Sequence, residues 1–438
     1  MNNKKNLVAA IDIGTTKIVV MIGKKHDDGK IEILGMGDSP SNGVKRGVVL
    51  NIEETVNSIK NAINLAQNQS GIRLTDVYVG IAGQHIKSIR TRGYNNRDSY
   101  DNEITKDEVQ ELIEDMYKIP IEVGEEIIHV LPQSYIVDSE TGIKNPVGMF
   151  GKRIEANFHI VIGQITSANN IKKCVKRTGL NVNKLILEPL ASSDAVLTDD
   201  EKEVGVTLVD IGGGTTDIAI YYEGIIQHTA VIPFGGNIIT SDIKKGCTIL
   251  EAQAEHLKIQ FGSAIVNNSL KNKVASVEGI SGRPPKEISF ESLAHIIQSR
   301  MEEIIAEIYF EIEASGISDK LGAGIVLTGG GALLKNLPQL VSYKTGYEVR
   351  LGLPNQHLIS DVIPEVNQPK YSTSIGLVLK GYQDIEDNGE ILDNKNEDPE
   401  LFEDDMKKTN QPKNKKNKMI NGFLEKFSEL FEVDDSKM

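Results

Sequence analysis

The chain has 438 residues, which at about 150 residues per domain predicts roughly three structural units and excludes a single small domain. Its 48 basic and 62 acidic residues give a net charge of −14, so the surface repels phosphate and nucleic acid is excluded as an expected partner. Two cysteines, with no CxxC pair, predict neither a disulfide framework nor a zinc site and fit a reducing cytoplasm.

The sequence predicts no membrane-spanning segment. Its N-terminal apolar run, residues 7–13, contains Asp12 and is followed by Gly14, which does not fit a secretory signal. No stretch of about 18 consecutive apolar residues occurs in the sequence. Any contact with a membrane is therefore expected to be peripheral.

The first 83 residues predict alternating strands and helices. An apolar strand at 7–12 is followed by a turn at Gly14, Thr15 and Thr16, and a second strand at 17–22. This unit is a hairpin, unlike the strand-to-helix loop of Walker-type proteins. The apolar spacing then predicts a strand at 31–36, a helix at about 52–67 and a strand at 77–82.

A change of composition marks residues 84–163 as an inserted subdomain, with a helix near 106–117 and a strand at 127–137. Beyond it the α/β pattern resumes. It predicts, in chain order, a helix at 168–177, an element at 184–192, strands at 204–210, 218–222 and 225–232, a long helix from 290 to about 313 and a strand at 325–328.

Two glycine turns form a weak internal repeat, DIGTTK at residues 12–17 and DIGGGTTD at residues 210–217. In each, a strand delivers a carboxylate to its end, glycines let backbone N–H groups approach an anion, and threonine hydroxyls add donors. Two such hairpins facing each other could hold a polyphosphate, with Asp12 and Asp210 holding Mg²⁺ mainly through its waters. Either turn alone could equally be only a turn.

Lys17 and a third glycine cluster extend this prediction. Lys17 would supply a positive charge to the phosphates, although a solvated hairpin lysine is the alternative. The glycines at 329–331 follow a strand and are expected to precede a helix, where close backbone approach suits a nucleoside. No GxxxxGKS or GxxxxGKT sequence is present, which argues against a Walker-type NTPase.

The C-terminal segment differs from the rest. Residues 384–408 hold eleven acidic residues and three lysines with few aliphatic residues, which predicts a flexible tether. From Lys413 the charge reverses, and a basic lead-in precedes an amphipathic helix that fits an anionic membrane; packing on the protein's own core or on a partner is the alternative. The residues expected to contact the membrane are Lys415, Lys416, Lys418, Met419, Ile420, Phe423, Leu424, Phe427, Leu430 and Phe431.

The motifs DIGTTK, LVDIGGGTTD and LTGGGA, in this order and spacing, resemble the phosphate-1, phosphate-2 and adenosine motifs of the actin-like ATPase superfamily. Within it, the chain resembles the FtsA family of bacterial cell-division proteins, through NGVKRGVV at 42–49, EPLAS at 188–192, PFGG at 233–236 and ITSDI at 239–243. The resemblance implies an α/β, actin-like (RNase H-like) two-lobed ATPase fold with inserted subdomains and a disordered C-terminal tether ending in an amphipathic helix.

The same resemblance implies a subdomain organisation. Subdomain 1A is expected at 1–83 and 164–200, with 365–382 returning to it, and subdomain 1C at 84–163. Subdomain 2A is expected at 201–232 and 301–364, subdomain 2B at 233–300, an acidic flexible linker at 383–412, and a basic amphipathic membrane-targeting helix at 413–438.

The resemblance further implies ATP with Mg²⁺ as the cofactor. Glu188 falls where hydrolysing relatives position the attacking water. Glu255 and Lys258 fall where the family contacts the ribose and adenine, with an exposed helix face as the alternative. Such proteins are often weak ATPases, so hydrolysis is left open. The expected ATP-binding residues are Asp12, Gly14, Thr15, Thr16, Lys17, Asp210, Gly212, Gly213, Gly214, Thr215, Thr216, Asp217, Gly235, Gly236, Glu255, Lys258, Gly329, Gly330, Gly331 and Ala332, with Asp12 and Asp210 facing the metal.

The partners implied by the resemblance are the C-terminal peptide of the tubulin-like protein FtsZ, further copies of this chain, an anionic membrane surface and other division proteins. The location implied is the cytoplasmic face of the cell membrane at the division septum. Arg300 and Glu303 fall on the helix that matches the FtsZ-binding surface, with a solvated helix face as the alternative.

Three other protein classes share part of this pattern. A PilM-like actin homologue has a similar insertion and binds a short peptide, but would not need the C-terminal tail. A sugar or metabolite kinase shares the DxGTT opening, but the sequence offers no further candidate for a catalytic carboxylate. A DnaK-type chaperone would need a peptide-binding domain after the ATPase.

Overall fold

The computed structural model describes residues 7–97, 102–359 and 365–388. The predicted linker beyond residue 388 and the predicted helix at 413–438, with every residue expected to contact a membrane, lie outside these ranges. Within them, no helix is both long enough and apolar enough to cross a bilayer. Because residues 389–438 lie outside the described ranges, the prediction for the tail rests on the sequence alone.

The first of two large sheets is built around the N-terminal hairpin. Its strand order is β11-β6-β1-β2-β3, formed by β1 (Leu7–Ile13), β2 (Lys17–Lys25), β3 (Ile31–Pro40), β6 (Asp76–Ile81) and β11 (Asn181–Leu187). β1 pairs antiparallel with β2 and parallel with β6. Both faces of β1 are buried, as expected for a strand covered by helices on either side.

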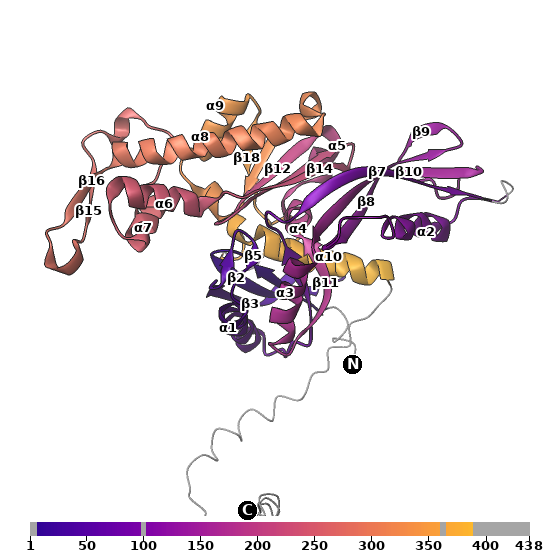
Figure 1. Cartoon of the computed structure of the whole chain (residues 1–438), viewed down its shortest axis with the longest axis horizontal. Coiled ribbons are helices and arrows are strands. Elements are labelled where there is room, and N and C mark those ends of the chain that lie inside the picture. Colours follow the sequence, from indigo (N-terminus) through magenta and orange to yellow (C-terminus); the bar gives the residue numbers. More distant parts are fainter. Residues whose placement is uncertain (1–6, 98–101, 360–364, 389–438) are drawn as a thin grey trace, which may run out of the picture. The chain divides into compact units, whose positions relative to one another are not determined.

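Helices cover both faces of this sheet (Figure 1). On one face, α1 (Ile52–Ser70) and α3 (Ile165–Lys176) bury their apolar stripes. α1 begins at Asn51, whose side chain accepts hydrogen bonds from two backbone N–H groups of the first turn. On the other face lie α4 (Glu188–Val196) and α10 (Ser372–Asn388). The segment predicted as one element at 184–192 is thus the end of β11 followed directly by α4.

α4 and α10 cross at a glycine. A Cβ added to Gly376 of α10 would lie 1.8 Å from the carbonyl oxygen of Ala191 on α4, so only glycine allows this approach. The crossing places the beginning of α10 beside the ends of the central strands.

We expect Gly376→Ala to lower the free energy of unfolding by roughly 3 kcal/mol, because neither helix can move away without disturbing a buried core. Urea unfolding of the full chain measures this. Gly246→Ala is the matched control, since a Cβ there would meet only the end of the Ile296 side chain, at 2.8 Å. The control should change stability by less than about 1 kcal/mol. Equal losses in both variants would contradict the role given to the crossing.

The second sheet repeats the arrangement of the first. Its strand order is β14-β13-β12-β17-β18, formed by β12 (Val206–Ile211), β13 (Thr216–Tyr222), β14 (Ile225–Ile232), β17 (Ile325–Thr328) and β18 (Val349–Leu351). β12 pairs antiparallel with β13 and parallel with β17, as β1 pairs with β2 and β6. The weak repeat in the sequence is therefore a repeat in the structure.

A long helix, α8 (Phe290–Ser315), packs on the second sheet and continues beyond it. Against its first half lie α6 (Gly236–Cys247) and α7 (Glu251–Phe261), with a two-stranded sheet of β15 (Val274–Val277) and β16 (Lys286–Ser289) close by, as Figure 1 shows. α5 (Asp199–Val204) and α9 (Leu337–Thr345) complete this half of the chain. One continuous apolar core joins α6, α7 and α8 to the second sheet.

The insertion forms a sheet of its own, with the order β7-β10-β8-β9. Its elements are β7 (Lys87–Asn96), α2 (Lys106–Met116), β8 (Glu125–Val137), β9 (Glu140–Ile143) and β10 (Arg153–Gln164). They enclose a separate apolar core in which Phe158 is fully buried.

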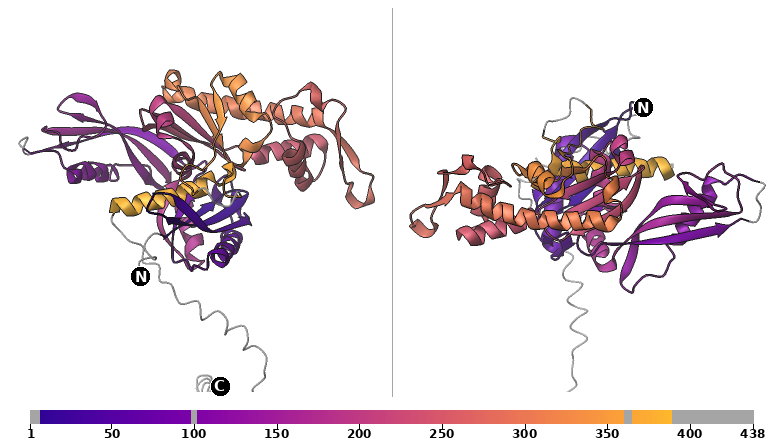
Figure 2. Two further views of the ribbon diagram at one scale, coloured as in Figure 1. Left: turned by 180° about the vertical axis from the view of Figure 1, so that it is seen from behind. Right: turned by 90° about the horizontal axis from the view of Figure 1, so that it is seen from above.

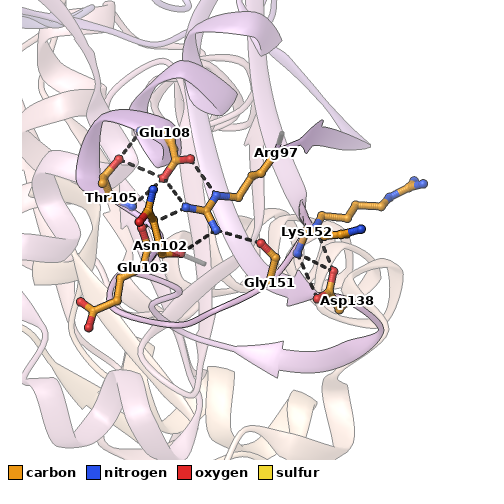
Figure 3. Close-up of polar contacts among 9 residues, drawn as sticks. Arg97, Asn102, Glu103, Thr105, Glu108, Asp138, Gly151 and Lys152 are labelled. Atoms are coloured by element: carbon orange, nitrogen blue, oxygen red, sulfur yellow. Dashed lines mark hydrogen bonds and ion pairs between the residues drawn. The ribbon is translucent and has the colours of Figure 1, made fainter. Parts of the chain in front are cut away.

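Polar contacts fasten the outer part of the insertion (Figure 3). The Arg97 guanidinium donates to Glu108 at the start of α2, at 2.7 Å, and to the carbonyl oxygen of Gly151, at 2.8 Å. Asp138 accepts hydrogen bonds from the backbone N–H groups of Lys152 and Arg153. These contacts hold α2 and the β8–β9 turn against the sheet.

The insertion also contacts the edge of the second sheet, as the two views of Figure 2 show. Arg90 donates to the carbonyl oxygen of Gln227 at 3.1 Å, and Gln133 donates to that of Ile226 at 2.8 Å. His159 Nε2 and Thr229 Oγ1 form a buried hydrogen bond of 2.8 Å, and burial lowers the pKa of His159 to about 4. The insertion is thus joined covalently to the first sheet and by hydrogen bonds to the second.

Candidate functional site

A cavity of about 480 Å³ lies where the β1–β2 turn and the β12–β13 turn meet. Most residues expected at the site, from the glycine motifs or from the family resemblance, line it, although they come from six separate parts of the chain. These are Asp12, Gly14, Thr15, Thr16, Lys17, Glu188, Asp210, Gly212, Gly213, Gly214, Thr215, Asp217, Gly236, Glu255, Lys258, Gly329, Gly330 and Gly331.

The two turns face each other at contact distance. A Cβ added to Gly214 would lie 2.4 Å from the Oγ1 atom of Thr15, and one added to Gly213 would lie 2.3 Å from the Cγ2 atom of Thr16. Glycine is therefore required at both positions for the turns to approach this closely. Both turns line one shared space; Thr15 and Thr16 of the first turn face it, whereas the hydroxyl of Thr215 in the second turn donates to Asp217 at 3.2 Å.

Asp12 and Asp210 lie at equivalent positions near the ends of β1 and β12, and both are almost fully buried. Burial raises the pKa of each carboxyl, and the Lys17 ammonium nearby partly opposes this effect. Oδ2 of Asp12 accepts a hydrogen bond from Ser374 at 2.9 Å, and Oδ2 of Asp210 accepts one from Ser192 at 2.7 Å. These hydrogen bonds, like the Thr373 contact described below, had no signal in the local sequence.

Asp217 and Glu188 add two further carboxyl groups. Asp217 pairs with Asp210 across the β12–β13 ladder, and its Oδ1 atom is buried without a hydrogen-bond partner. Burial, followed by the charges of nearby aspartates, raises the pKa of both groups well above the usual range. Such a concentration of buried carboxyl groups favours a cation, and Mg²⁺ fits because it takes oxygen ligands and keeps several waters.

The carboxyl groups at the cavity do not form a cluster that could coordinate a metal ion with several side chains at once. In the described ranges, no three His, Cys, Asp or Glu side chains are close enough together to hold a metal ion among them.

Lys17 lines the cavity and is partly buried instead of solvated. Its ammonium donates to the carbonyl oxygen of Lys370 and lies 4.0 Å from the centre of the Tyr371 ring. Burial lowers the pKa of Lys17 to about 8, although Asp12 favours the charged form. The positive charge predicted for this site is therefore present at neutral pH.

Glu255 and Lys258 of α7 face the cavity, so they are not an exposed helix face. Lys258 Nζ lies 2.7 Å from the Glu255 carboxylate and donates to the carbonyl oxygen of Gly236 at 3.0 Å. Two apolar side chains that sequence analysis missed, Ile259 and Leu333, also line the cavity and are 65% and 50% exposed. This end of the cavity suits a flat, partly apolar group.

Three residues expected to contact the nucleotide, Thr216, Gly235 and Ala332, are not among those that line the cavity. Thr216 is fully buried, and its hydroxyl donates to the carbonyl oxygen of Phe234 at 2.8 Å. Gly235 packs against the β12–β13 turn, where an added Cβ would lie 2.6 Å from the carbonyl oxygen of Gly212. Ala332 is buried in the apolar core of the second half. Thr216 and Gly235 therefore pack beside the β12–β13 turn, and Ala332 is part of the core.

Arg300 and Glu303 lie together on α8, away from the cavity lining. The Arg300 guanidinium donates to Asp242 of α6 at 2.6 Å and to Glu303. The two residues therefore form part of a three-member charged group on one surface.

Family models match two regions of this chain, the second half that holds the β12–β13 turn and the insertion. A family model described as "Cell division protein FtsA" matches residues 207–376, and one described as "SHS2 domain inserted in FTSA" matches residues 83–162. The cell division protein FtsA of Pseudomonas aeruginosa is 40% identical over 377 residues, which are 86% of this chain and 89% of that protein. The chain belongs to the FtsA family of cell-division proteins. The FtsA of Escherichia coli strain K12 is 35% identical over 384 residues, covering 86% and 90% of the two chains.

Solved structures show that the FtsA-family chain shares its fold with more distant proteins. A chain of the PilM-PilN type IV pilus biogenesis complex has a TM-score of 0.62 at 14% identity, covering 85% of this chain and 98% of that one. MreB5 of Spiroplasma citri bound to ADP has a TM-score of 0.52 at 15% identity, covering 88% and 97%. The α/β, actin-like, two-lobed fold expected from the sequence is confirmed.

Proposed function

We propose that this FtsA-family protein binds ATP with Mg²⁺ in the cavity between its glycine turns, polymerises on the cytoplasmic face of the membrane, and tethers FtsZ filaments there at the division septum. The observation that carries the nucleotide site is the pair of facing turns, each with a buried carboxylate near the end of its first strand. Membership of the family supports the role in division, and the tail sequence supports attachment to the membrane.

The chain's own groups suit each part of Mg-ATP. Backbone N–H groups of both turns and the hydroxyls of Thr15 and Thr16 would hold the phosphates, while Ile259 and Leu333 offer apolar surface to the base. Asp12 and Asp210 would hold waters of Mg²⁺, whose charge offsets that of the phosphates when it is bound. Glu188, which faces the same cavity, would orient a water for slow hydrolysis.

Lys17 gives the proposed ATP binding a pH dependence. Because its pKa is about 8, the ammonium loses its proton as the pH rises through 8, and the attraction to phosphate is lost with it. We expect ATP affinity to be constant from pH 6 to 7.5 and to fall between pH 8 and 10, by up to about tenfold per pH unit. Isothermal titration calorimetry measures this. Lys17→Arg, which stays charged throughout, should abolish the decline, and an unchanged decline would contradict the assignment.

The tail supports a reversible membrane anchor. Complete burial of one apolar side chain contributes about 1.5–3 kcal/mol, and an interfacial helix gains only part of that for each residue. The acidic linker that the sequence predicts at 383–412 would have a root-mean-square reach of roughly 30 Å as a flexible chain, which would let the helix bind a bilayer while the body stays clear. Several protomers side by side would multiply the effective affinity, so polymerisation and membrane attachment reinforce each other.

FtsZ binding is proposed for the surface of α8 that carries Arg300 and Glu303. We expect Arg300→Glu to weaken binding of an FtsZ C-terminal peptide roughly tenfold or more, because it reverses the charge and places a carboxylate beside Asp242. Fluorescence anisotropy with a labelled peptide measures the affinity. Lys244→Glu is the matched control, since it reverses a charge on α6 that pairs with Glu251 instead. Equal affinities for wild type and Arg300→Glu would place the peptide elsewhere.

Reconstitution on a supported anionic bilayer tests the whole proposal. Fluorescent FtsZ should collect on the bilayer only when this protein and Mg-ATP are both present. The subdomain boundaries expected from the resemblance enter the proposal unchanged, with the anchor on 413–438 and with the peptide on the α8 surface of Arg300 and Glu303, where subdomain 2B (233–300) meets 2A. FtsZ that stays in solution beside a membrane-bound partner would contradict the tethering role.

A further inference from the structure

A short segment before and within the first turn of α10 contacts both sheets in alternation. Residues 369–371 form a single 3-10 turn, and α10 begins at Ser372. From the first sheet, the segment receives three contacts: Lys17 Nζ donates to the Lys370 carbonyl oxygen, Tyr371 donates to Asp38 at 3.0 Å, and Ser374 donates to Asp12 at 2.9 Å.

The second sheet contacts the other three residues of this segment, Pro369, Ser372 and Thr373. The backbone N–H of Gly329 donates to the Pro369 carbonyl oxygen at 3.2 Å, the hydroxyls of Ser372 and Thr328 share a hydrogen bond of 2.7 Å, and Thr373 donates to Asp210 at 3.0 Å. Along residues 369–374 the contacts therefore change from one sheet to the other three times, since 370–371 and 374 contact the first sheet and 369 and 372–373 contact the second. The close crossing of Gly376 with Ala191 fixes the position of this turn.

Two of these contacts end on the carboxylates that face the cavity. Ser374 donates to the Oδ2 atom of Asp12, and Thr373 donates to the Oδ2 atom of Asp210. In the described part of the chain, Oδ1 of neither carboxylate accepts a hydrogen bond from the protein. The Oδ1 atom of Asp210 lies against Gly329, where an added Cβ would meet it at 2.3 Å. One oxygen of each carboxylate is thus fixed and the other is left available.

We propose that Ser374 and Thr373 are positioning residues that set the orientation and spacing of Asp12 and Asp210 for one shared cation. The inference rests on the proposed binding of Mg-ATP and adds the groups that orient its metal-facing carboxylates. A hydroxyl hydrogen-bonded to a carboxylate restricts its rotation, and loss of such a supporting group typically weakens metal binding about 10- to 100-fold. Because both hydroxyls are on one helical turn, the two carboxylates keep a constant relation even though they belong to different sheets.

The two carboxylates are not held equally. Asp210 accepts a second hydrogen bond, from Ser192 at 2.7 Å, whereas Ser374 is the only described side chain that donates to Asp12. Ser374→Ala should therefore release Asp12 completely. Thr373→Val should leave Asp210 oriented by Ser192, so its effect emerges only when Ser192→Ala is combined with it.

The test compares the affinity for a fluorescent ATP analogue in Mg²⁺ with that in EDTA, using the full chain. The wild type should bind more tightly in Mg²⁺. Ser374→Ala and the pair Ser192→Ala with Thr373→Val should lower that Mg²⁺-dependent gain about tenfold while affinity in EDTA stays the same. Thr373→Val alone should lower the Mg²⁺-dependent gain less than threefold. When Ser192→Ala is combined with Thr373→Ser instead of Thr373→Val, the hydroxyl at position 373 is kept, and the gain should return to the wild-type value.

Ser372→Ala is the matched control, since this hydroxyl lies in the same turn but bonds Thr328 instead of a carboxylate. It should leave the gain from Mg²⁺ unchanged. Equal loss of affinity in Mg²⁺ and EDTA, or no loss in Ser374→Ala, would overturn the positioning role. Failure of the wild type to bind the analogue in either condition would instead overturn the proposed nucleotide site.

Discussion

A chain that ends at residue 412 will not sediment with anionic vesicles in Mg-ATP, whereas the full chain will. The removed segment holds the basic lead-in and every residue expected to enter the interface. Each lysine near an anionic surface contributes about 1 kcal/mol, and the apolar stripe adds the burial of side chains such as Phe423 and Phe427. With both contributions removed, a body of net negative charge is repelled by the same lipids.

Two controls separate the helix from the rest of the chain. The truncated chain should bind ATP as the full chain does, because every residue lining the cavity precedes residue 374. Phe423→Asp with Phe427→Asp in the full chain should abolish vesicle binding as completely as truncation, since it destroys the apolar stripe and keeps the lysines. Equal sedimentation of the truncated and full chains would show that the membrane is bound by another surface.

Gly214→Val will lower the affinity for ATP about 100-fold, which corresponds to roughly 2.7 kcal/mol of binding free energy. The first added carbon already lies 2.4 Å from the Oγ1 atom of Thr15, so the two turns must separate, and the two methyl groups then occupy the space between them. Overpacking of a close contact costs about 1–3 kcal/mol. Calorimetric titration of the variant with Mg-ATP measures the loss.

A double substitution tests whether the cause is the contact between the turns. In the Thr15→Ala background, the smaller change Gly214→Ala should cost less affinity than it does in the wild type, because the Oγ1 and Cγ2 atoms of Thr15 are gone and only its Cβ atom, at 2.9 Å, remains close. The coupling between the two sites should exceed 1 kcal/mol. Strictly additive losses would mean that the turns do not act as a pair.

Local patterns predicted the central parts of the fold. The strands at 225–232 and 325–328 have the bounds expected, because each is rich in β-branched residues and is followed by a chain-breaking residue, Pro233 or Gly329. The two glycine turns were placed correctly on hairpins, and their facing arrangement agrees with the repeat in the sequence. A helix was expected to follow the glycines at 329–331, and α9 does follow them, but not directly. Instead a single 3-10 turn, Gly330–Leu333, comes first and α9 begins at Leu337.

What the sequence could not predict depends on partners that are far apart along the chain. Ser374 and Asp12 are separated by 362 positions, so nothing near either residue indicates the hydrogen bond between them. Lys17 was expected to be available to phosphate, but its contacts with Lys370 and Tyr371 come from a segment with no glycine motif. In the sequence, Ile259 and Leu333 cannot be distinguished from other apolar residues. Only the fold places them together at the cavity, because it brings α7 close to the third glycine cluster.

The position of α10 in the first sheet also sets an order of events during synthesis. Val378 and Tyr382 of α10 fill the core that Val8 and Tyr78 begin, so the N-terminal half cannot close its core until nearly all of the chain has been made. At about 5–20 residues per second, the first strand waits at least some 20 s for its last partner. The segment at 413–438 then leaves the ribosome after the helix that completes the fold, separated from it only by residues 389–412. A protein made in this order presents its proposed membrane anchor only when the body behind it is able to fold.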